Sequence, residues 1–255
     1  MPTSLWTTSF WKVNRQGKTN RQVRIALISG LVVVMTVLCA GAQEKPAPEP
    51  LTKYLGRRIA QPMSYHGIPW LNRPERLQEE NPQEMLEQLK VEPNMTVCDM
   101  GCGDGYYTVE LARRVGSGGK VLAVDIQPEM LQELSRRCER LDIKNVDMVL
   151  GLPHDPKLPD GKVDLILMVD VYHEFSNPVE MLDAMRRSLK PGGRIALVEF
   201  RGEDPTVPIK PEHKMTKKQI LKEYKANGFQ LVSQYDKLPW QHLMFLSPGS
   251  EPDSE

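Results

Sequence analysis

The chain has 255 residues, with 33 basic and 33 acidic side chains and therefore no formal net charge. This length suits one ordinary domain plus a leader and is sufficient to bury a hydrophobic core. The charge is uneven, because residues 1–42 hold five basic side chains and no acidic one. Subtracting these five leaves 28 basic against 33 acidic residues, a net charge of −5 for the remainder. Such a domain lacks the basic excess that typifies nucleic-acid binding, so nucleic acid is excluded as a partner.

Residues 1–42 have the pattern of an export signal. The basic region precedes an uncharged, mostly apolar run over residues 25–38, and Ala40-Gly41-Ala42 follows as a small-x-small cleavage site. The run is short for a bilayer span, which needs about 20 residues. We interpret residues 1–42 as a signal peptide of an exported, periplasmic or extracytoplasmic protein. A retained inner-membrane anchor is the alternative, as is a cytoplasmic protein that begins near Leu51. Membrane contact is expected only if the apolar segment is retained.

The rest of the chain alternates helical and strand patterns. Residues 43–80 are predicted as a linker and leader segment, residues 81–248 as the folded domain, and residues 249–255 as a disordered tail. Helices are predicted to begin near residues 82, 106, 128, 178 and 216. Strands are predicted over residues 96–100, 120–125, 146–150, 163–169, 194–200, 229–235 and 240–246. Alternation of this kind favours an α/β fold whose largely parallel sheet has helices on both faces. The last two strands are joined too closely for a crossover and must pair antiparallel.

The most informative segment follows the first of these seven strands and reads Asp99-Met100-Gly101-Cys102-Gly103-Asp104-Gly105. An acidic residue lies near the end of a buried strand, and a G-x-G-x-G turn leads into a helix. Gly101 and Gly103 let the backbone turn tightly and approach a ligand, since no Cβ stands between them. A dinucleotide site has G-x-G-x-x-G instead, and its helix faces a pyrophosphate. Asp99 does not suit that anion, but it suits a ligand that carries an ammonium group.

Two more strand ends extend this site. The second strand ends in Asp125, whose carboxylate can accept hydrogen bonds from both hydroxyls of a ribose. Ile126 beside it offers an apolar face to a base. The third strand leads to Asp155, which can accept a hydrogen bond from the exocyclic amine of adenine. Together these positions indicate a ligand with an amino-acid end, a ribose and an adenine.

The run 99–105, Asp125 and the sequence Leu189-Lys190-Pro191-Gly192-Gly193-Arg194 resemble the class I S-adenosylmethionine-dependent methyltransferases over about residues 82–247. Residues 54–60 and 70–73 are similar to a bacterial subgroup of small-molecule-type methyltransferases. The resemblance implies a Rossmann-like, doubly wound sheet of order 3-2-1-4-5-7-6 with strand 7 antiparallel. It also implies S-adenosylmethionine as the cofactor. The predicted cofactor contacts are Asp99, Gly101, Cys102, Gly103, Gly105, Asp125, Ile126 and Asp155.

The methyl acceptor is expected beyond the end of the fourth strand, beside the cofactor. Methyl transfer from a sulfonium is a direct displacement, so the protein mainly aligns the two reactants and excludes water. A base is needed only if the acceptor has a proton to lose. His173 is the candidate base or orienting group, and a purely structural role in its loop is an equal alternative. Tyr172, Glu199 and Arg201 are candidates for substrate binding, although Arg201 also suits a surface ion pair.

These patterns predict an enzyme that methylates a small molecule. The alternative is a non-catalytic nucleoside-binding domain on the same fold. A nicotinamide-dependent oxidoreductase is disfavoured by the glycine spacing and by Asp99. The cysteines at 98, 102 and 138 lack the spacing of metal ligands, so no metal is predicted. An exported enzyme of this kind needs a supply of S-adenosylmethionine outside the cytoplasm, where the cofactor is made.

Overall fold

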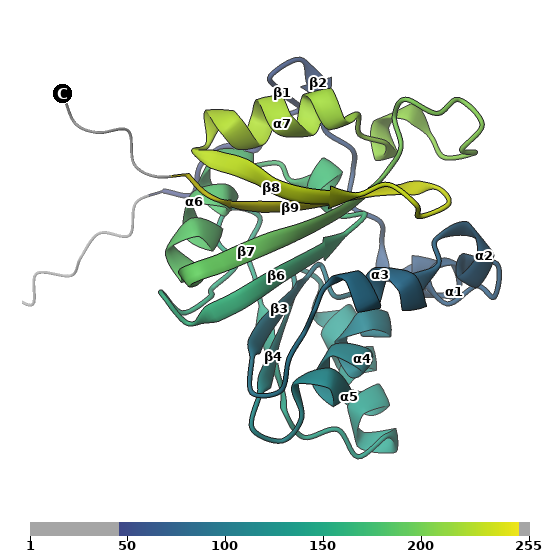
Figure 1. Cartoon of the computed structure of the whole chain (residues 1–255), viewed down its shortest axis with the longest axis vertical. Helices are drawn as coiled ribbons and strands as arrows, with labels where there is room; N and C mark the ends of the chain where they lie inside the picture. The colour runs from purple at the N-terminus through teal and green to yellow at the C-terminus, as the bar shows by residue number, and fades with distance from the viewer. Residues whose placement is uncertain (1–45, 250–255) are drawn as a thin grey trace, which may run out of the picture. The chain divides into compact units, whose positions relative to one another are not determined.

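The computed structural model describes residues 46–249 (Figure 1). The predicted signal peptide and its alternatives, together with nearly all of the predicted tail, lie outside these described residues. Among residues 46–249, every helix is too short or too polar to cross a membrane.

The sheet has seven strands in the order β5-β4-β3-β6-β7-β9-β8. The strands are β3 Thr96–Met100, β4 Lys120–Asp125, β5 Val146–Leu150, β6 Val163–Val169, β7 Leu189–Phe200, β8 Phe229–Tyr235 and β9 Gln241–Pro248. Only β9 runs against its neighbours, pairing antiparallel with both β7 and β8. Counted along the chain, this order is 3-2-1-4-5-7-6, so the predicted topology is confirmed. One strand begins earlier than predicted, because Leu189 pairs with Val163 before a register shift in β7.

Five helices flank the sheet: α3 Pro82–Gln88, α4 Tyr106–Val115, α5 Pro128–Arg140, α6 Pro178–Ser188 and α7 Lys217–Ala226. The central strands are apolar on both faces, and successive side chains enter different cores. Val97 and Leu165 pack in a cluster with α3 and α4, whereas Cys98 and Ile166 pack in a cluster with α6 and α7. Figure 1 shows these two groups of helices on either side of the sheet. Burial on two faces explains the nearly continuous apolar strand β6.

Residues 46–80 form what we call the N-terminal strap. It contains the short hairpin β1 Lys53–Tyr54 and β2 Arg57–Arg58, then η1 Tyr65–Gly67, α1 Ile68–Leu71 and α2 Arg76–Glu79. Backbone hydrogen bonds fasten it to the domain. Leu51 N donates to Ser176 O at 2.8 Å and Ala60 N to His173 O at 3.1 Å, while Glu79 O accepts from Trp240 N at 3.1 Å. The strap is therefore joined to the loops that follow β6 and precede β9.

Candidate active site

A cavity of about 920 Å³ lies between the carboxyl ends of β3, β4 and β6 and the N-terminal strap. Its volume falls in the range of roughly 300–1,000 Å³ that is typical of cofactor and small-molecule sites. Parallel α/β sheets bind ligands at this edge, where the loops of neighbouring strands diverge. Residues at the strand ends form one part of its wall, and strap residues such as Pro62, Met63 and Trp70 form the other.

The glycine turn after β3 forms part of the cavity wall. Gly101 and Gly103 have φ angles of 69° and 54°, a region that favours glycine. A Cβ on Gly101 would come within 2.4 Å of Val171 Cγ2, so a side chain there would collide with the loop after β6. Both glycines face the cavity, as predicted for the backbone that approaches the cofactor.

Asp125 lies at the end of β4 and also lines the cavity. Its Oδ2 accepts a hydrogen bond from Gly103 N at 2.9 Å, and its Oδ1 accepts one from Gln127 N at 2.9 Å. The carboxylate thus connects the glycine turn with the loop after β4. Burial raises the pKa of Asp125, against the effect of these amide donors. Ile126 lies beside it on the cavity wall, with 41% of its surface exposed.

Four other predicted contacts lie away from the cavity wall. The Asp99 carboxylate is buried beneath the turn, where it accepts a hydrogen bond from Thr108 Oγ1 at 2.6 Å. Cys102 packs in a small core with Leu134 of α5, and Gly105 is the residue that precedes α4. Asp155 accepts a hydrogen bond from Lys157 N within its own loop at 2.8 Å. These four residues do not line the cavity, and their contact with the cofactor stays a prediction.

The buried Asp99 predicts a specific pH dependence of stability. Burial raises its pKa to about 6, above the value near 3.9 expected in an unfolded chain. Between these values the folded protein holds a proton that the unfolded chain releases, so the free energy of unfolding falls as the pH rises from about 4 to about 6. The decrease in the free energy of unfolding that Asp99 causes over this range is on the order of 2 kcal/mol, and it should be absent in Asp99→Asn. Urea unfolding of both proteins at pH 4.5, 5.5 and 6.5 measures the difference, and parallel pH profiles would contradict it.

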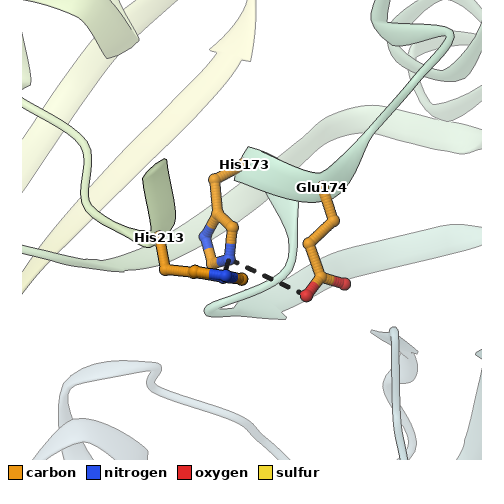
Figure 2. A group of neighbouring side chains, drawn as sticks. All are labelled: His173, Glu174 and His213. Carbon is orange, nitrogen blue, oxygen red and sulfur yellow. Dashed lines mark hydrogen bonds and ion pairs between the residues drawn. The ribbon is translucent and has the colours of Figure 1, made fainter. Parts of the chain in front are cut away.

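The other end of the cavity holds His173, Glu174 and His213 (Figure 2). The first two lie on the short helix η2 Tyr172–Glu174 after β6, and His213 lies on η3 Pro211–His213. His173 Nε2 is 3.0 Å from His213 Nδ1 and 3.9 Å from Glu174 Oε1. Figure 2 shows the three side chains converging from the two segments. Sequence spacing does not reveal this group, because η2 and η3 are far apart along the chain.

Glu199 of β7 lies behind His173. It has no exposed surface, and its two oxygens lie 3.1 Å from His173 N and 2.7 Å from His173 Nδ1. Burial opposes protonation of His173, but the carboxylates of Glu199 and Glu174 together outweigh burial and raise the pKa of the imidazole. Burial and the neighbouring His173 lower the pKa of His213. Burial also raises the pKa of Glu174 to about 7, although its Oε1 accepts a hydrogen bond from Met63 N.

A third group of polar residues lines the cavity near the end of β6. Asp170 Oδ2 accepts a hydrogen bond from Gln241 Nε2 at 2.6 Å, whereas its Oδ1 is buried and has no hydrogen-bond partner among residues 46–249. The strap contributes Arg76 and Glu80, joined Nε to Oε2 at 2.6 Å. Burial raises the pKa of Asp170, and the nearby Glu80 adds to that effect. No sequence pattern indicates Arg76 and Glu80 as site residues, since they come from a segment without strong periodicity.

The structure corrects two predicted substrate contacts. Tyr172 is fully buried, and its hydroxyl donates to Glu223 Oε2 at 2.9 Å in the core next to α7. Arg201 points to the turn between β8 and β9, where its guanidinium donates to Asp236 O at 2.7 Å and Pro239 O at 3.0 Å. Neither residue lines the cavity. Both neighbour cavity residues in sequence: Tyr172 lies on the side of η2 that faces the core, and Arg201 follows Phe200 at the end of β7, where neighbouring side chains point to opposite faces. Glu199 reaches the site only through His173.

The comparisons with known proteins agree with this geometry. A family model described as a methyltransferase domain matches residues 91–243, more than half of the chain. The chain belongs to the class I S-adenosylmethionine-dependent methyltransferases. It is therefore an enzyme of that family with S-adenosylmethionine as its cofactor, and the glycine turn, Asp125 and the buried Asp170 oxygen provide a wall suited to such a ligand.

Individual relatives show how far the similarity extends. A solved S-adenosylmethionine-dependent methyltransferase from Aquifex aeolicus is 27% identical with a TM-score of 0.68, covering 72% of this chain and 98% of that one. A ribosomal protein L11 methyltransferase from Burkholderia mallei is 40% identical over 115 residues, 45% of this chain and 34% of the relative. A demethylmenaquinone methyltransferase from Listeria welshimeri is 25% identical over 49% of this chain and 52% of the relative. The chain thus spans about a third to a half of these curated relatives.

Proposed function

We propose that this methyltransferase transfers the methyl group of S-adenosylmethionine to a small-molecule acceptor bound in the cavity. The observation that supports this proposal is the N-terminal strap, which covers the carboxyl edge of the sheet and leaves a bounded cavity rather than an open face. A small molecule fits within such a space, whereas a folded protein or a nucleic acid needs an exposed platform. The strap residues between Pro50 and Met63 contribute directly to the wall.

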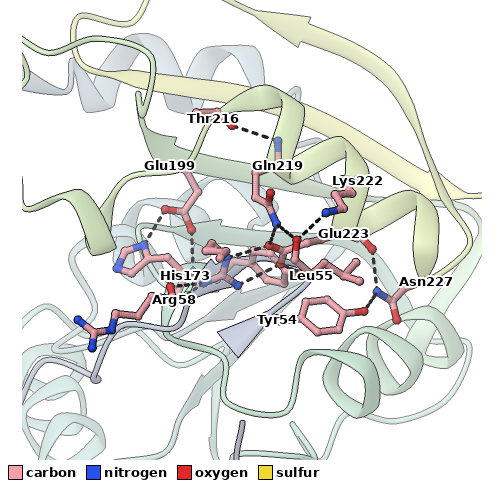
Figure 3. A network of polar contacts seen from close by, with 12 residues as sticks. Tyr54, Leu55, Arg58, His173, Glu199, Thr216, Gln219, Lys222, Glu223 and Asn227 are labelled. Carbon is pink, nitrogen blue, oxygen red and sulfur yellow. Dashed lines mark hydrogen bonds and ion pairs between the residues drawn. The ribbon is translucent and has the colours of Figure 1, made fainter. Parts of the chain in front are cut away.

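The strap is held firmly enough to act as a fixed wall. Arg57 donates to Glu223 of α7 through Nε at 2.8 Å and Nη2 at 3.0 Å, and its Nη1 donates to His173 O at 2.8 Å. Asn227 Nδ2 donates to the Tyr54 hydroxyl at 2.8 Å. Figure 3 shows Tyr54, Glu223 and Asn227 where the strap meets α7. Because both ion-pair partners are nearly buried, this attachment differs from a solvent-exposed surface contact.

The cavity divides into a cofactor end and an acceptor end. At the cofactor end, we assign Asp125 to the ribose and Ile126 to the adenine. The backbone of Gly101 and Gly103 is where the protein chain comes closest to the cofactor. We place the amino-acid part against Asp170 and Arg76, since the unpartnered Asp170 oxygen suits an ammonium and a guanidinium suits a carboxylate. When bound, the cofactor supplies a methyl group that is already activated on a sulfonium.

The cavity that holds His173, Glu174 and His213 also has apolar wall residues, among them Phe175, Met181, Phe200 and Ile209. An apolar wall excludes water and positions the acceptor body, and the polar group fixes the atom that receives the methyl. We infer that the nucleophilic atom of the acceptor lies against His173. Glu199 keeps this imidazole in one orientation, because the Nδ1 side is engaged at 2.7 Å.

A protein acceptor is the alternative, because one relative is named as a ribosomal protein methyltransferase. The two are separated by incubating the full chain with labelled S-adenosylmethionine and either a small-metabolite extract or a protein extract. We expect label in the small-molecule fraction. Label that enters only protein would contradict the proposal and favour the alternative.

His173→Ala should lower turnover of an acceptor found in this screen by about 100-fold. This is the low end of the rate enhancement that a side chain acting as general acid or base usually provides. The affinity for S-adenosylhomocysteine should change much less, because His173 lies at the other end of the cavity. His66→Ala is the matched control, since His66 is an exposed strap residue outside the cavity wall. Steady-state kinetics and calorimetry check both effects, and unchanged turnover would return His173 to a structural role.

A further inference from the structure

We propose that His173, Glu174 and His213 bind a divalent transition-metal cation at the acceptor end of the cavity. Two imidazole nitrogens and a carboxylate oxygen form a common ligand set for zinc and for non-haem iron. Among residues 46–249, these are the His, Cys, Asp and Glu side chains whose ligand atoms lie close enough together to share one metal ion. The inference rests on the proposed function, because the metal ion would bind the acceptor that this function requires.

The distances between ligand atoms suit a shared ion. One ligand atom from each residue lies within 4.8 Å of the other two. His173 Nε2 is 3.0 Å from His213 Nδ1 and 3.9 Å from Glu174 Oε1. Two ligands on a zinc ion at roughly 2.0–2.1 Å in tetrahedral geometry are about 3.3 Å apart. The observed separations bracket this value, so small side-chain movements are sufficient to close the site around a cation.

A hydrogen bond explains why His173 and His213 lie together, but it does not explain the position of Glu174 beside them. The separation of 3.9 Å between His173 Nε2 and Glu174 Oε1 is too long for a hydrogen bond. The carboxylate nevertheless faces the imidazole from within the cavity wall, as Figure 2 shows. A hydrogen bond between the two histidines leaves Glu174 outside the interaction; its Oε1 accepts a hydrogen bond from Met63 N at 3.1 Å and, with a second lone pair, can still bind an ion. A cation between the three atoms engages all of them.

The residues around the group resemble the support of a metal site. Histidine ligands commonly donate their second ring N–H to a carboxylate, which fixes the ring and the tautomer. Glu199 Oε2 is 2.7 Å from His173 Nδ1, and the same carboxylate also accepts from His173 N. Glu199 is fully buried, so this orientation is rigid. With Nδ1 engaged in this way, Nε2 is the nitrogen that faces the cavity and is available to a metal.

Because the three residues line the cavity wall, an ion bound to them would be in a position to bind the acceptor. Three protein ligands leave at least one coordination position open, as in catalytic metal sites. An acceptor hydroxyl or thiol bound there loses its proton to water more easily, because the ion lowers its pKa. The resulting anion attacks the methyl carbon of the sulfonium. The bond from sulfur to methyl breaks as the bond to the acceptor forms, giving the methylated acceptor and S-adenosylhomocysteine.

The test uses the full chain after chelation and removal of the chelator. Zinc is titrated by calorimetry into the wild type, His213→Ala and Glu174→Gln, and cobalt is added to record visible ligand-field bands. Thermal unfolding confirms that each variant is folded. His66→Ala is the matched control, because His66 is exposed on η1. Glu199→Gln tests the supporting carboxylate. S-adenosylhomocysteine binding is measured on the same metal-free samples.

We expect the wild type to bind a single zinc ion per chain, with unchanged affinity in His66→Ala. Loss of the ligand in His213→Ala or Glu174→Gln should lower zinc affinity by about 100-fold or more, and Glu199→Gln by roughly 10- to 100-fold. Failure of the wild type to bind zinc, or equal losses in His66→Ala and His213→Ala, would overturn the metal site. If such a sample still binds S-adenosylhomocysteine, the proposed methyl transfer stands without the metal. Zinc binding without nucleoside binding would instead support the site and contradict the methyltransferase function.

Discussion

Asp125→Ala is expected to weaken binding of S-adenosylmethionine at least about 100-fold while the domain stays folded. A hydrogen bond to a charged group contributes roughly 1.5–3 kcal/mol, and the carboxylate is placed to accept two from the ribose. The side chain also joins the amides of Gly103 and Gln127, so its removal loosens the turn that faces the ligand. Calorimetry of the full chain with S-adenosylmethionine and S-adenosylhomocysteine measures the loss.

Asp147→Ala is the matched control for this experiment. Asp147 lies on the neighbouring strand β5, has 53% of its side chain exposed and pairs with Lys120 outside the cavity. Its replacement should leave nucleoside affinity unchanged, because an exposed pair of this kind contributes little to any site. Equal affinity of Asp125→Ala and the wild type would show that the ribose does not lie at the end of β4.

Glu223→Ala should reduce the free energy of unfolding by about 3–5 kcal/mol, as removal of one partner from a buried ion pair usually does. Glu223 has no exposed side-chain surface, and that of Arg57 is 8% exposed. The carboxylate accepts from Arg57, from the Tyr172 hydroxyl at 2.9 Å and from Gln219 Nε2 at 2.7 Å. Its loss leaves the guanidinium buried without its counter-ion and weakens the attachment of the strap to α7, which then depends on contacts such as Asn227 with Tyr54. Urea unfolding followed by circular dichroism gives the change.

Two further variants identify the cause of that loss. Glu133→Ala removes an exposed helical pair with Arg136 and should cost only about 0.3–0.5 kcal/mol. Replacing both buried partners with apolar residues, as Arg57→Met with Glu223→Leu, should restore most of the stability, because no unpaired charge remains. A double variant as unstable as Glu223→Ala would contradict the buried-charge explanation, as would a loss no larger than that of Glu133→Ala.

The core of the fold was predictable because local signals agree with the tertiary structure. Proline at the first position of α3, α5 and α6 identifies helix starts, and Thr216 accepts a hydrogen bond from Gln219 N before α7 as a capping residue should. The strand over residues 163–169 is apolar except for Asp164, because both of its faces are covered. The G-x-G-x-G turn and the acidic end of β4, both picked out by the sequence, lie on the cavity wall.

The acceptor end was only partly predictable, since it depends on segments distant in sequence. His173 lies shortly after the end of β6, but His213 reaches it from η3, in the loop before α7. No periodic pattern predicts such convergence. Tyr172 and Arg201 were misassigned for a related reason, since a residue beside a cavity residue in sequence points away from it when the chain is extended or turns sharply.

Binding of S-adenosylhomocysteine to the full chain, followed by isothermal calorimetry, tests the central claim most directly. The cavity at the ends of β3, β4 and β6 should hold one nucleoside per chain in the micromolar range, and Asp125→Ala should weaken this binding at least about 100-fold. A folded sample that gives no heat with S-adenosylmethionine or S-adenosylhomocysteine would contradict the assignment of this cavity as the methyltransferase site, and would favour a non-catalytic role for the domain.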